Sequence, residues 1–496
     1  MIPPLATPPA RVLLPRFDTY GDIVLLSGFL AALRRAWPEA ELHLLVRESY
    51  RDLETLLPVA LTWRTSTVAT PYDGRPAEGI PADLSDLLAE PWDLCLATVF
   101  SGTWIDEIVL AELAGRGVPC VRLAGPDAAA APGLDTVPVA AATPEPDKYQ
   151  ALFGALTGGA APVPAPRLEA PPALRRRAET VLAELGLAPG GYVVCLTGGV
   201  QNNGIKVWPA DRFARCVDHL RDRHGLATLI CGHESEQAIV RSVAEAATGP
   251  RPAVWLGGSG DMPLLGALLA LSRLYLGNDT GPMHMAQALD VPAVAIFGGG
   301  NWPRFLPTGR GAVCFSSWPC YGCNWDCLLV DAPCVRAVPL AGVTGAIDRV
   351  LAAAPDLERH DFPHGAALEE VLFKQAHDPA FVGPRQLRQV LDKTRSYLAF
   401  VESDRAARLE VIEEQGAMIG YQRGQLAHQH DIIAEKCKTI ADAAPLIHRL
   451  EKLLIRIRRI LGPVLPRYVT ARLDTFITVL HQIAATSGPA APPDGP

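Results

Sequence analysis

The stretch from Arg273 to Phe297, RLYLGNDTGPMHMAQALDVPAVAIF, decides the fold of this 496-residue chain. It predicts a strand over Arg273–Leu276, then a loop of small polar residues, a helix over Pro282–Leu289 and a strand over Ala293–Phe297. Pro282 suits the first turn of a helix, because the N–H that proline lacks has no partner there anyway. Strand, helix and strand in close succession indicate a parallel sheet with helices on its faces.

The same alternation extends along most of the chain, and a Pro-rich stretch, residues 158–173, interrupts it. We therefore expect an α/β protein with two Rossmann-like, doubly wound domains, residues 1–165 and 166–355. Further strands are expected over Arg11–Leu14, Glu41–Val46, Trp92–Ala97, Val118–Leu123, Tyr192–Leu196 and Ala227–Ile230, and helices over Ile23–Trp37, Leu174–Leu185 and Ala210–His224.

The end of the chain differs in character. Residues 356–486, which include a long run poor in Pro and Gly and rich in Glu, Arg and Gln, predict an α-helical extension, partly coiled coil. A basic segment, Leu446–Arg472, fits either helix packing and homo-oligomer formation or peripheral contact with an anionic membrane. Residues 487–496 are expected to form a disordered tail.

Composition and charge argue against several classes of protein. A net charge of -8 argues against nucleic acid as the main partner. The start of the chain lacks a secretory signal, and no apolar run reaches the roughly 20 residues that span a bilayer. Eleven Cys residues without a small-domain disulfide pattern fit a reducing compartment. We expect a cytoplasmic protein, with peripheral contact at the inner membrane left open.

The loop Gly277–His284, GNDTGPMH, joins a strand to a helix and forms a potential anion site. The Thr280 hydroxyl and the amides of Thr280 and Gly281 can donate to a diphosphate. Asp279 would instead orient the loop or bind a sugar hydroxyl. The alternative is a capped helix without a ligand.

Two further loops follow predicted strands. In Arg16–Asp22, RFDTYGD, Asp22 begins a helix and is either its N-cap or a general base for an acceptor hydroxyl. In Thr197–Pro209, TGGVQNNGIKVWP, small residues let backbone amides approach an anion, and Lys206 adds a positive charge before the next helix.

These motifs together resemble the heptosyltransferase family of bacterial envelope glycosyltransferases, glycosyltransferase family 9, over roughly Arg11–Arg349. The likeness is strongest at Gly21-Asp22, at Lys206-Val207-Trp208-Pro209 with Arg212-Phe213, and at Asn278–His284. The resemblance implies a GT-B fold and inverting transfer of heptose or a related sugar from a nucleotide donor, ADP-heptose. The resemblance also implies that catalysis requires no cofactor. In agreement, no Asp-x-Asp metal motif is found at a suitable loop.

The resemblance also implies roles for residues. Asp22 takes the role of catalytic base, and Lys206 that of a phosphate contact. An acidic residue near the donor ribose falls on Glu234 or Glu236, and the two remain alternatives. The remaining donor-binding residues that we expect are Thr197, Asp279, Thr280, Gly281 and His284.

Two departures from the family pattern lie on the acceptor side, at Phe17–Tyr20 and at Leu26-Ser27-Gly28. They leave the acceptor open: a lipopolysaccharide core or other lipid-linked envelope acceptor, or a protein, as in autotransporter glycosylation. A third reading is a non-catalytic scaffold that only binds nucleotide.

A cysteine cluster lies within the second expected domain. Four thiolates could hold a structural zinc or iron ion, and the alternative is buried thiols or a redox-labile pair. The branch of the family that modifies autotransporter proteins is known for an iron-binding segment of this kind. The cysteines concerned are Cys320, Cys323, Cys327 and Cys334.

Overall fold

The computed structural model divides into two compact units, Met1–Ala367 and Leu368–Pro496, and each is described by itself. The predicted tail and most of the predicted helical extension, residues 363–447, lie outside the described residues. The structure describes residues 7–67, 82–100, 102–126, 128, 131–159, 161–198, 204–318, 321, 325, 332–353, 355–362, 448–459 and 467–486.

The first half of the larger unit, residues 7–159, contains a six-stranded parallel sheet in the order β3-β2-β1-β4-β5-β6. The order reverses between β1 and β4, and ligands of doubly wound sheets bind beyond the carboxyl ends of the strands at such a point. The strands are β1 (Arg11–Pro15), β2 (Glu41–Arg47), β3 (Thr62–Ser66), β4 (Leu94–Ala97), β5 (Cys120–Ala124) and β6 (Leu134–Pro138).

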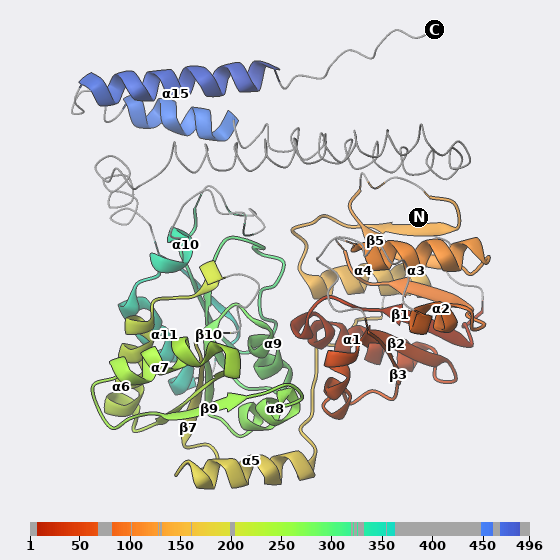
Figure 1. Ribbon diagram of the computed structural model, residues 1–496, viewed down its shortest axis with the longest axis horizontal. Coiled ribbons are helices and arrows are strands. Elements are labelled where there is room, and N and C mark those ends of the chain that lie inside the picture. The colour runs from red at the N-terminus through yellow and green to blue at the C-terminus, as the bar shows by residue number, and fades with distance from the viewer. Residues whose placement is uncertain are drawn as a thin grey trace, which may run out of the picture. The chain divides into compact units, whose positions relative to one another are not determined.

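Helices cover both faces of this sheet (Figure 1). Successive side chains of β1 point to opposite faces, so Val12 and Leu14 join one buried cluster with α1 and α4, and Leu13 joins another with α2 and α3. The helices are α1 (Tyr20–Ala36), the short 3-10 helix η1 (Glu48–Thr55), α2 (Ala82–Leu88), α3 (Trp104–Gly115) and α4 (Glu145–Thr157).

The second half, residues 172–362, repeats the plan with a seven-stranded sheet in the order β13-β12-β11-β10-β7-β8-β9, again with parallel neighbours. Its order reverses between β7 and β10. The elements are α5 (Pro172–Glu184), β7 (Tyr192–Leu196), η2 (Gly204–Lys206), α6 (Ala210–His224), β8 (Ala227–His233), η3 (Glu234–Glu236), α7 (Gln237–Ala246), β9 (Ala253–Gly257), α8 (Met262–Ala270), β10 (Leu274–Asn278), α9 (Gly281–Ala288), β11 (Ala293–Phe297), β12 (Gly311–Phe315), α10 (Pro333–Arg336), α11 (Leu340–Ala353) and β13 (Glu358–Asp361).

The segment between the two halves is extended and fixed to both of them. The Ser27 hydroxyl of α1 accepts a hydrogen bond from Arg167 N at 2.9 Å. Leu168 N donates to Ala288 O at the end of α9, at 2.8 Å. Gly28 lets the segment cross α1 closely, because a Cβ atom there would lie 2.1 Å from Pro164 O. The connecting segment therefore contacts both halves of the larger unit.

The predicted fold class is confirmed, with parallel sheets and helices in two halves. The strands expected at Tyr192–Leu196 and Ala293–Phe297 and the helix at Ala210–His224 have the bounds that the sequence predicts. Strand β13, residues 358–361, pairs with β12, so the second sheet continues beyond residue 355.

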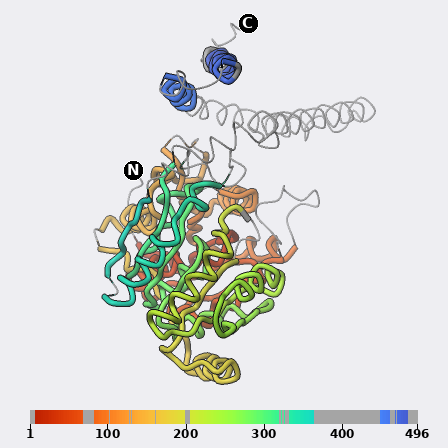
Figure 2. Tube along the Cα trace, turned by 90° about the vertical axis from the view of Figure 1, so that its left-hand side faces the viewer, coloured from red at the N-terminus to blue at the C-terminus, as the bar shows by residue number. Residues whose placement is uncertain are grey.

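In the smaller unit, residues 448–459 are helical and pack beside α15 (Arg467–Thr486) (Figure 2). Arg458 forms an ion pair with Asp474, with Nη2 2.8 Å from Oδ2, and His481 lies 2.8 Å from Glu451. Within the described residues, no helix has the length and apolar character that a bilayer span requires.

Candidate active site

The point where strand order reverses in the second sheet brings two of the predicted loops together. Thr197 follows β7, and Asn278 ends β10. The buried Asn278 side chain accepts from Trp208 N at 3.2 Å and donates to Thr197 O at 3.0 Å. It therefore fixes both ends of the segment that carries Lys206. The Thr197 hydroxyl is itself buried, without a hydrogen-bond partner among the described residues.

The amino terminus of α9 is the predicted anion site. Thr280 is its N-cap residue in an extended conformation, and its side chain does not cap the helix. The Thr280 hydroxyl instead lies 3.3 Å from Tyr275 Oη. The first amides of a helix have no partner inside it and carry the positive end of the helix dipole, so this end of α9 favours an anion.

Lys206 projects from η2 toward this terminus. Its ammonium lies 3.8 Å from Asp279 Oδ2 and 4.6 Å from the centre of the Trp325 ring, with 21% of the side chain exposed. Asp279 therefore orients the charged group that we expect to meet a phosphate. His284, one turn into α9, is buried, and burial lowers its pKa against the opposing effects of Asp279 and Asp22. The imidazole is consequently neutral at neutral pH.

Asp22 lies in the first turn of α1 and is 7% exposed. The N-cap of this helix is Thr19, so the N-cap interpretation of Asp22 is wrong. The Thr19 hydroxyl donates to Asp22 Oδ2 at 2.6 Å, and Arg16 Nη2 lies 3.2 Å from Oδ1. Asp22 is thus held by a hydroxyl and a buried guanidinium.

Arg16 is a residue whose role the sequence did not reveal. It is fully buried at the end of β1, pairs with Asp18 at 2.7 Å, and donates to Thr98 O at 2.7 Å. Thr98 follows β4, so Arg16 joins the two strands at the reversal point of the first sheet. The only signal in the sequence is a basic residue directly after a buried strand.

The amino termini of α1 and α9 come into direct contact. A Cβ atom on Gly21 would lie 3.0 Å from Gly281 Cα and 3.2 Å from the His284 ring, and one on Gly281 would lie 3.2 Å from Gly21 N. A side chain at either position would crowd this contact. Asp22 of the first half therefore lies beside the predicted anion site of the second half.

A second contact joins the halves nearby. Glu145 N, at the start of α4, donates to Arg304 O at 3.1 Å, and the Arg304 guanidinium forms an ion pair with the Glu145 carboxylate. Lys148 also lies 2.7 Å from Glu145. Burial would raise the pKa of Glu145, but the charges of Arg304 and Lys148 outweigh it and lower the pKa.

Glu234 and Glu236 occupy different surroundings in η3. The Glu236 carboxylate lies against Gly198 in the loop after β7, where a Cβ atom would approach it to 2.6 Å. Glu234 lies nearer Gly258, after β9, at 3.7 Å from the equivalent atom. Of the two candidates, Glu236 borders the loop that leads to Lys206.

Of the cysteine cluster, Cys334 is described, and Cys320, Cys323 and Cys327 lie outside the described residues. Cys334 is buried in α10, where its Sγ accepts a hydrogen bond from Gly299 N at 3.5 Å. The metal site therefore stays a prediction.

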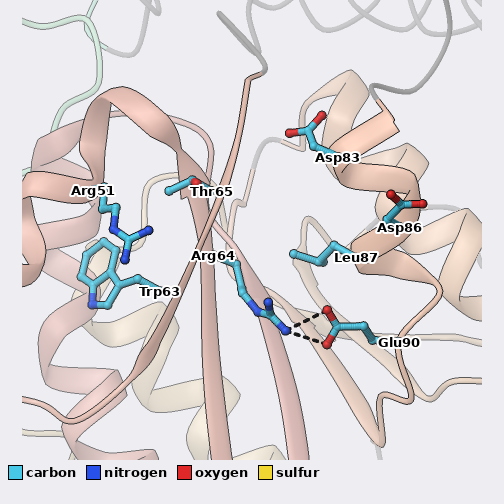
Figure 3. A pocket seen from close by; sticks show the side chains of 8 residues that line it. All are labelled: Arg51, Trp63, Arg64, Thr65, Asp83, Asp86, Leu87 and Glu90. Carbon is cyan, nitrogen blue, oxygen red and sulfur yellow. Dashed lines mark hydrogen bonds and ion pairs between the residues drawn. The ribbon is translucent and has the colours of Figure 1, made fainter.

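A cavity of about 330 Å³ opens between β3, η1 and α2 in the first half (Figure 3). An ion pair of 2.6 Å joins Arg64 to Glu90 on one side. None of the predicted site residues lines the cavity, so it is separate from the site described above. The lining residues are Arg51, Trp63, Arg64, Thr65, Asp83, Asp86, Leu87 and Glu90.

Comparison with known proteins finds relatives of part of this chain. Residues 135–324 match the sequence model of glycosyltransferase family 9 (heptosyltransferase). Over 112 residues the chain is 34% identical to lipopolysaccharide heptosyltransferase 3 of Escherichia coli strain K12, which covers 22% of this chain and 32% of that protein. This part of the chain is therefore similar to glycosyltransferase family 9.

A second relative, lipopolysaccharide heptosyltransferase 3 of Escherichia coli, is 30% identical over 146 residues, covering 29% of this chain and 42% of that protein. The chain thus spans about a third to two fifths of the length of these curated relatives.

Two solved structures share the fold. The E. coli ADP-heptose LPS heptosyltransferase II matches with a TM-score of 0.53 and 17% identity, over 69% of this chain and 98% of that one. A family 9 glycosyl transferase from Veillonella parvula matches with a TM-score of 0.50 and 20% identity, over 60% and 83%. The expected GT-B fold is confirmed, with helices in the C-terminal unit.

Proposed function

We propose that this protein is an inverting glycosyltransferase of family 9 that transfers heptose, or a related sugar, from a nucleoside diphosphate donor to a cell-envelope acceptor. ADP-heptose is the proposed donor and a lipopolysaccharide core the proposed acceptor. One observation carries the proposal: Gly21 and Gly281 are in contact, so Asp22 lies beside the anion site at α9. A base and a leaving-group site must be adjacent for a direct displacement.

The donor-binding role rests on charge and dipoles. The Lys206 ammonium and the amides of Thr280 and Gly281 are proposed to bind the diphosphate, and Asp279 keeps Lys206 in place at 3.8 Å. Glu236, which borders Gly198, is the preferred candidate for the ribose hydroxyls. Thr197 and His284 line the same loops, and a neutral His284 adds no charge to the site.

The proposed reaction is a single displacement at the anomeric carbon. The acceptor hydroxyl gives its proton to the Asp22 carboxylate as its oxygen bonds to that carbon. The bond from the carbon to the diphosphate oxygen breaks on the opposite face, which inverts the configuration. The negative charge that grows on the leaving diphosphate is stabilised by Lys206 and the amides at α9.

Nucleotide binding and turnover test the proposal. Thermal shift with ADP, UDP and GDP should show stabilisation by ADP, since a bound ligand raises the melting temperature. The protein should then release ADP from ADP-heptose when a deacylated lipopolysaccharide core is added. A protein that binds none of the three nucleotides, or binds ADP without turnover on any acceptor, contradicts the assignment and favours the scaffold alternative.

The acceptor, compartment and assembly belong to the same proposal. A lipid-linked acceptor would place the enzyme in the cytoplasm at the inner membrane, and a protein acceptor is the alternative. The paired helices of the smaller unit leave Ile455 45% and Val479 42% exposed, which supports either membrane contact or a homo-oligomer. Sedimentation with anionic vesicles and light scattering distinguish these two outcomes. Metal analysis tests the proposed structural zinc or iron.

A further inference from the structure

Trp325 lies next to the proposed donor site, and the function proposed above assigns it no role. It belongs to the segment that carries the cysteine cluster. The centre of its ring lies 4.6 Å from the Lys206 ammonium. A cation at this distance from the face of an indole is attracted by the negative charge of the ring face, and Trp is the strongest of the aromatic partners.

The chain makes room for this ring at several points. A Cβ atom on Gly300 would lie 2.2 Å from the indole, and one on Gly298 would lie 2.8 Å from it. Trp325 itself has a backbone φ of 65°, in the left-handed region that residues other than glycine rarely adopt. The two glycines therefore leave room for the indole against the loop that follows β11, and the chain accepts an unfavourable backbone conformation at Trp325 there.

The indole also leaves a polar atom unused. Trp325 Nε1 is buried and has no hydrogen-bond acceptor among the described residues. A buried N–H without an acceptor is costly, and such groups are usually paired. An N–H donor that lacks an acceptor beside a lysine ammonium is suited to an oxygen of an anionic ligand.

We propose that Trp325 is a positioning residue of the donor site, which holds the Lys206 ammonium toward the diphosphate and donates Nε1–H to an oxygen of the bound donor. Lys206 thus stands between the Asp279 carboxylate and the indole face. Without the indole, the flexible lysine side chain would lose one of these two contacts. The inference rests on the proposed function, because it takes a nucleoside diphosphate as the ligand.

The test measures ADP binding by isothermal titration calorimetry in a double-mutant cycle. Trp325→Leu should weaken ADP binding on the order of tenfold, because both the ring face and the N–H are lost. Trp325→Phe keeps an aromatic face and should lose only about threefold. In the Lys206→Met background, Trp325→Leu should cost less than in the wild-type background, because the ammonium is gone.

A matched control is Trp302→Phe, since Trp302 packs on Tyr321 of the same segment at 5.8 Å. It should leave ADP affinity within twofold. Equal losses from Trp325→Leu in both backgrounds, or wild-type affinity in Trp325→Leu, would overturn the inference. If Trp325→Leu does not fold, wild-type affinity in Trp325→Phe overturns the N–H contact. A wild-type protein that binds no ADP, UDP or GDP contradicts the proposed function itself.

Discussion

At the residue scale, the first half concentrates charge in places that water does not reach. Arg16, Glu145 and Lys148 are fully buried, and Asp18 is 4% exposed. Burial lowers the pKa of Lys148 to about 8 in spite of Glu145. Removing one member of such a group leaves another charge unpaired, which typically costs about 3–5 kcal/mol. Arg16 pairs with Asp18 and Asp22 and so orders the loop of Asp22, and substitution of Arg16 should change stability and activity together.

Asp106 is another buried ionisable residue of the first half, and it offers a separate test of what burial of a charge costs. Burial raises the pKa of its carboxyl from 3.8 to about 6, although hydrogen bonds from Thr103 oppose the shift. The folded protein therefore binds a proton more tightly than the unfolded chain. The stabilisation of the folded state that this proton provides is fully present below pH 3.8 and is lost as the pH rises through about 6. The free energy of unfolding of Asp106→Asn should therefore rise by about 3 kcal/mol relative to that of wild type between pH 4 and pH 7.

Urea unfolding at a series of pH values measures that gain. Wild type measured over the same pH series is the reference, and the difference between the two proteins should widen as the pH rises. A pH-independent difference for Asp106→Asn would show that the carboxyl is not desolvated in the folded protein.

At the element scale, glycines set how closely helices and loops approach. Gly28 in α1 permits the crossing by Pro164, whereas Gly115 in α3 has no atom within 4 Å of a potential Cβ. Gly28→Ala should therefore destabilise the protein by about 1–3 kcal/mol through overpacking. Gly115→Ala should be neutral or stabilising by up to about 1 kcal/mol, because alanine favours helix. Chemical denaturation of both variants checks this, and equal stabilities would contradict the crossing.

Several strands with continuous apolar runs could be predicted from sequence, although the wholly buried β12 (GAVCF) was missed, and the polar edge strands could not. Tyr192–Leu196 and Ala293–Phe297 are wholly buried strands whose composition identifies them. The edge strands β3 (TWRTS) and β13 (ERHD) were missed, because an edge strand with polar residues carries no such pattern. Their place in the sheets follows from tertiary pairing alone.

Some residues of the candidate site could be predicted from sequence, and others could not. Loop motifs pointed to Asp22, Lys206 and Asp279, and the structure brings Lys206 within 3.8 Å of Asp279. The role of Asn278 depends on Trp208, 70 residues away, and that of Arg304 on Glu145, 159 residues away. Such partners depend on the tertiary fold, so no local pattern reveals them.

At the scale of the whole molecule, the larger unit, Met1–Ala367, contains both sheets and all the proposed donor and base residues. A chain ending at Ala367 should therefore fold and bind ADP within about twofold of the full chain. Circular dichroism and calorimetry measure both properties. The end point retains β13, residues 358–361, which completes the second sheet. Loss of ADP binding in this soluble fragment would mean that the smaller unit contributes to the donor site.

The most direct test of the account is the turnover of Asp22→Asn with ADP-heptose and an acceptor that wild type uses. The account predicts a fall in kcat of about 10²–10⁴-fold, the usual contribution of a general base, with the ADP dissociation constant within about threefold. Asp18→Asn, which disturbs the same Arg16 at 2.7 Å, should lose less than tenfold. An Asp22→Asn enzyme that turns over within tenfold of wild type would contradict the role of Asp22 as the base.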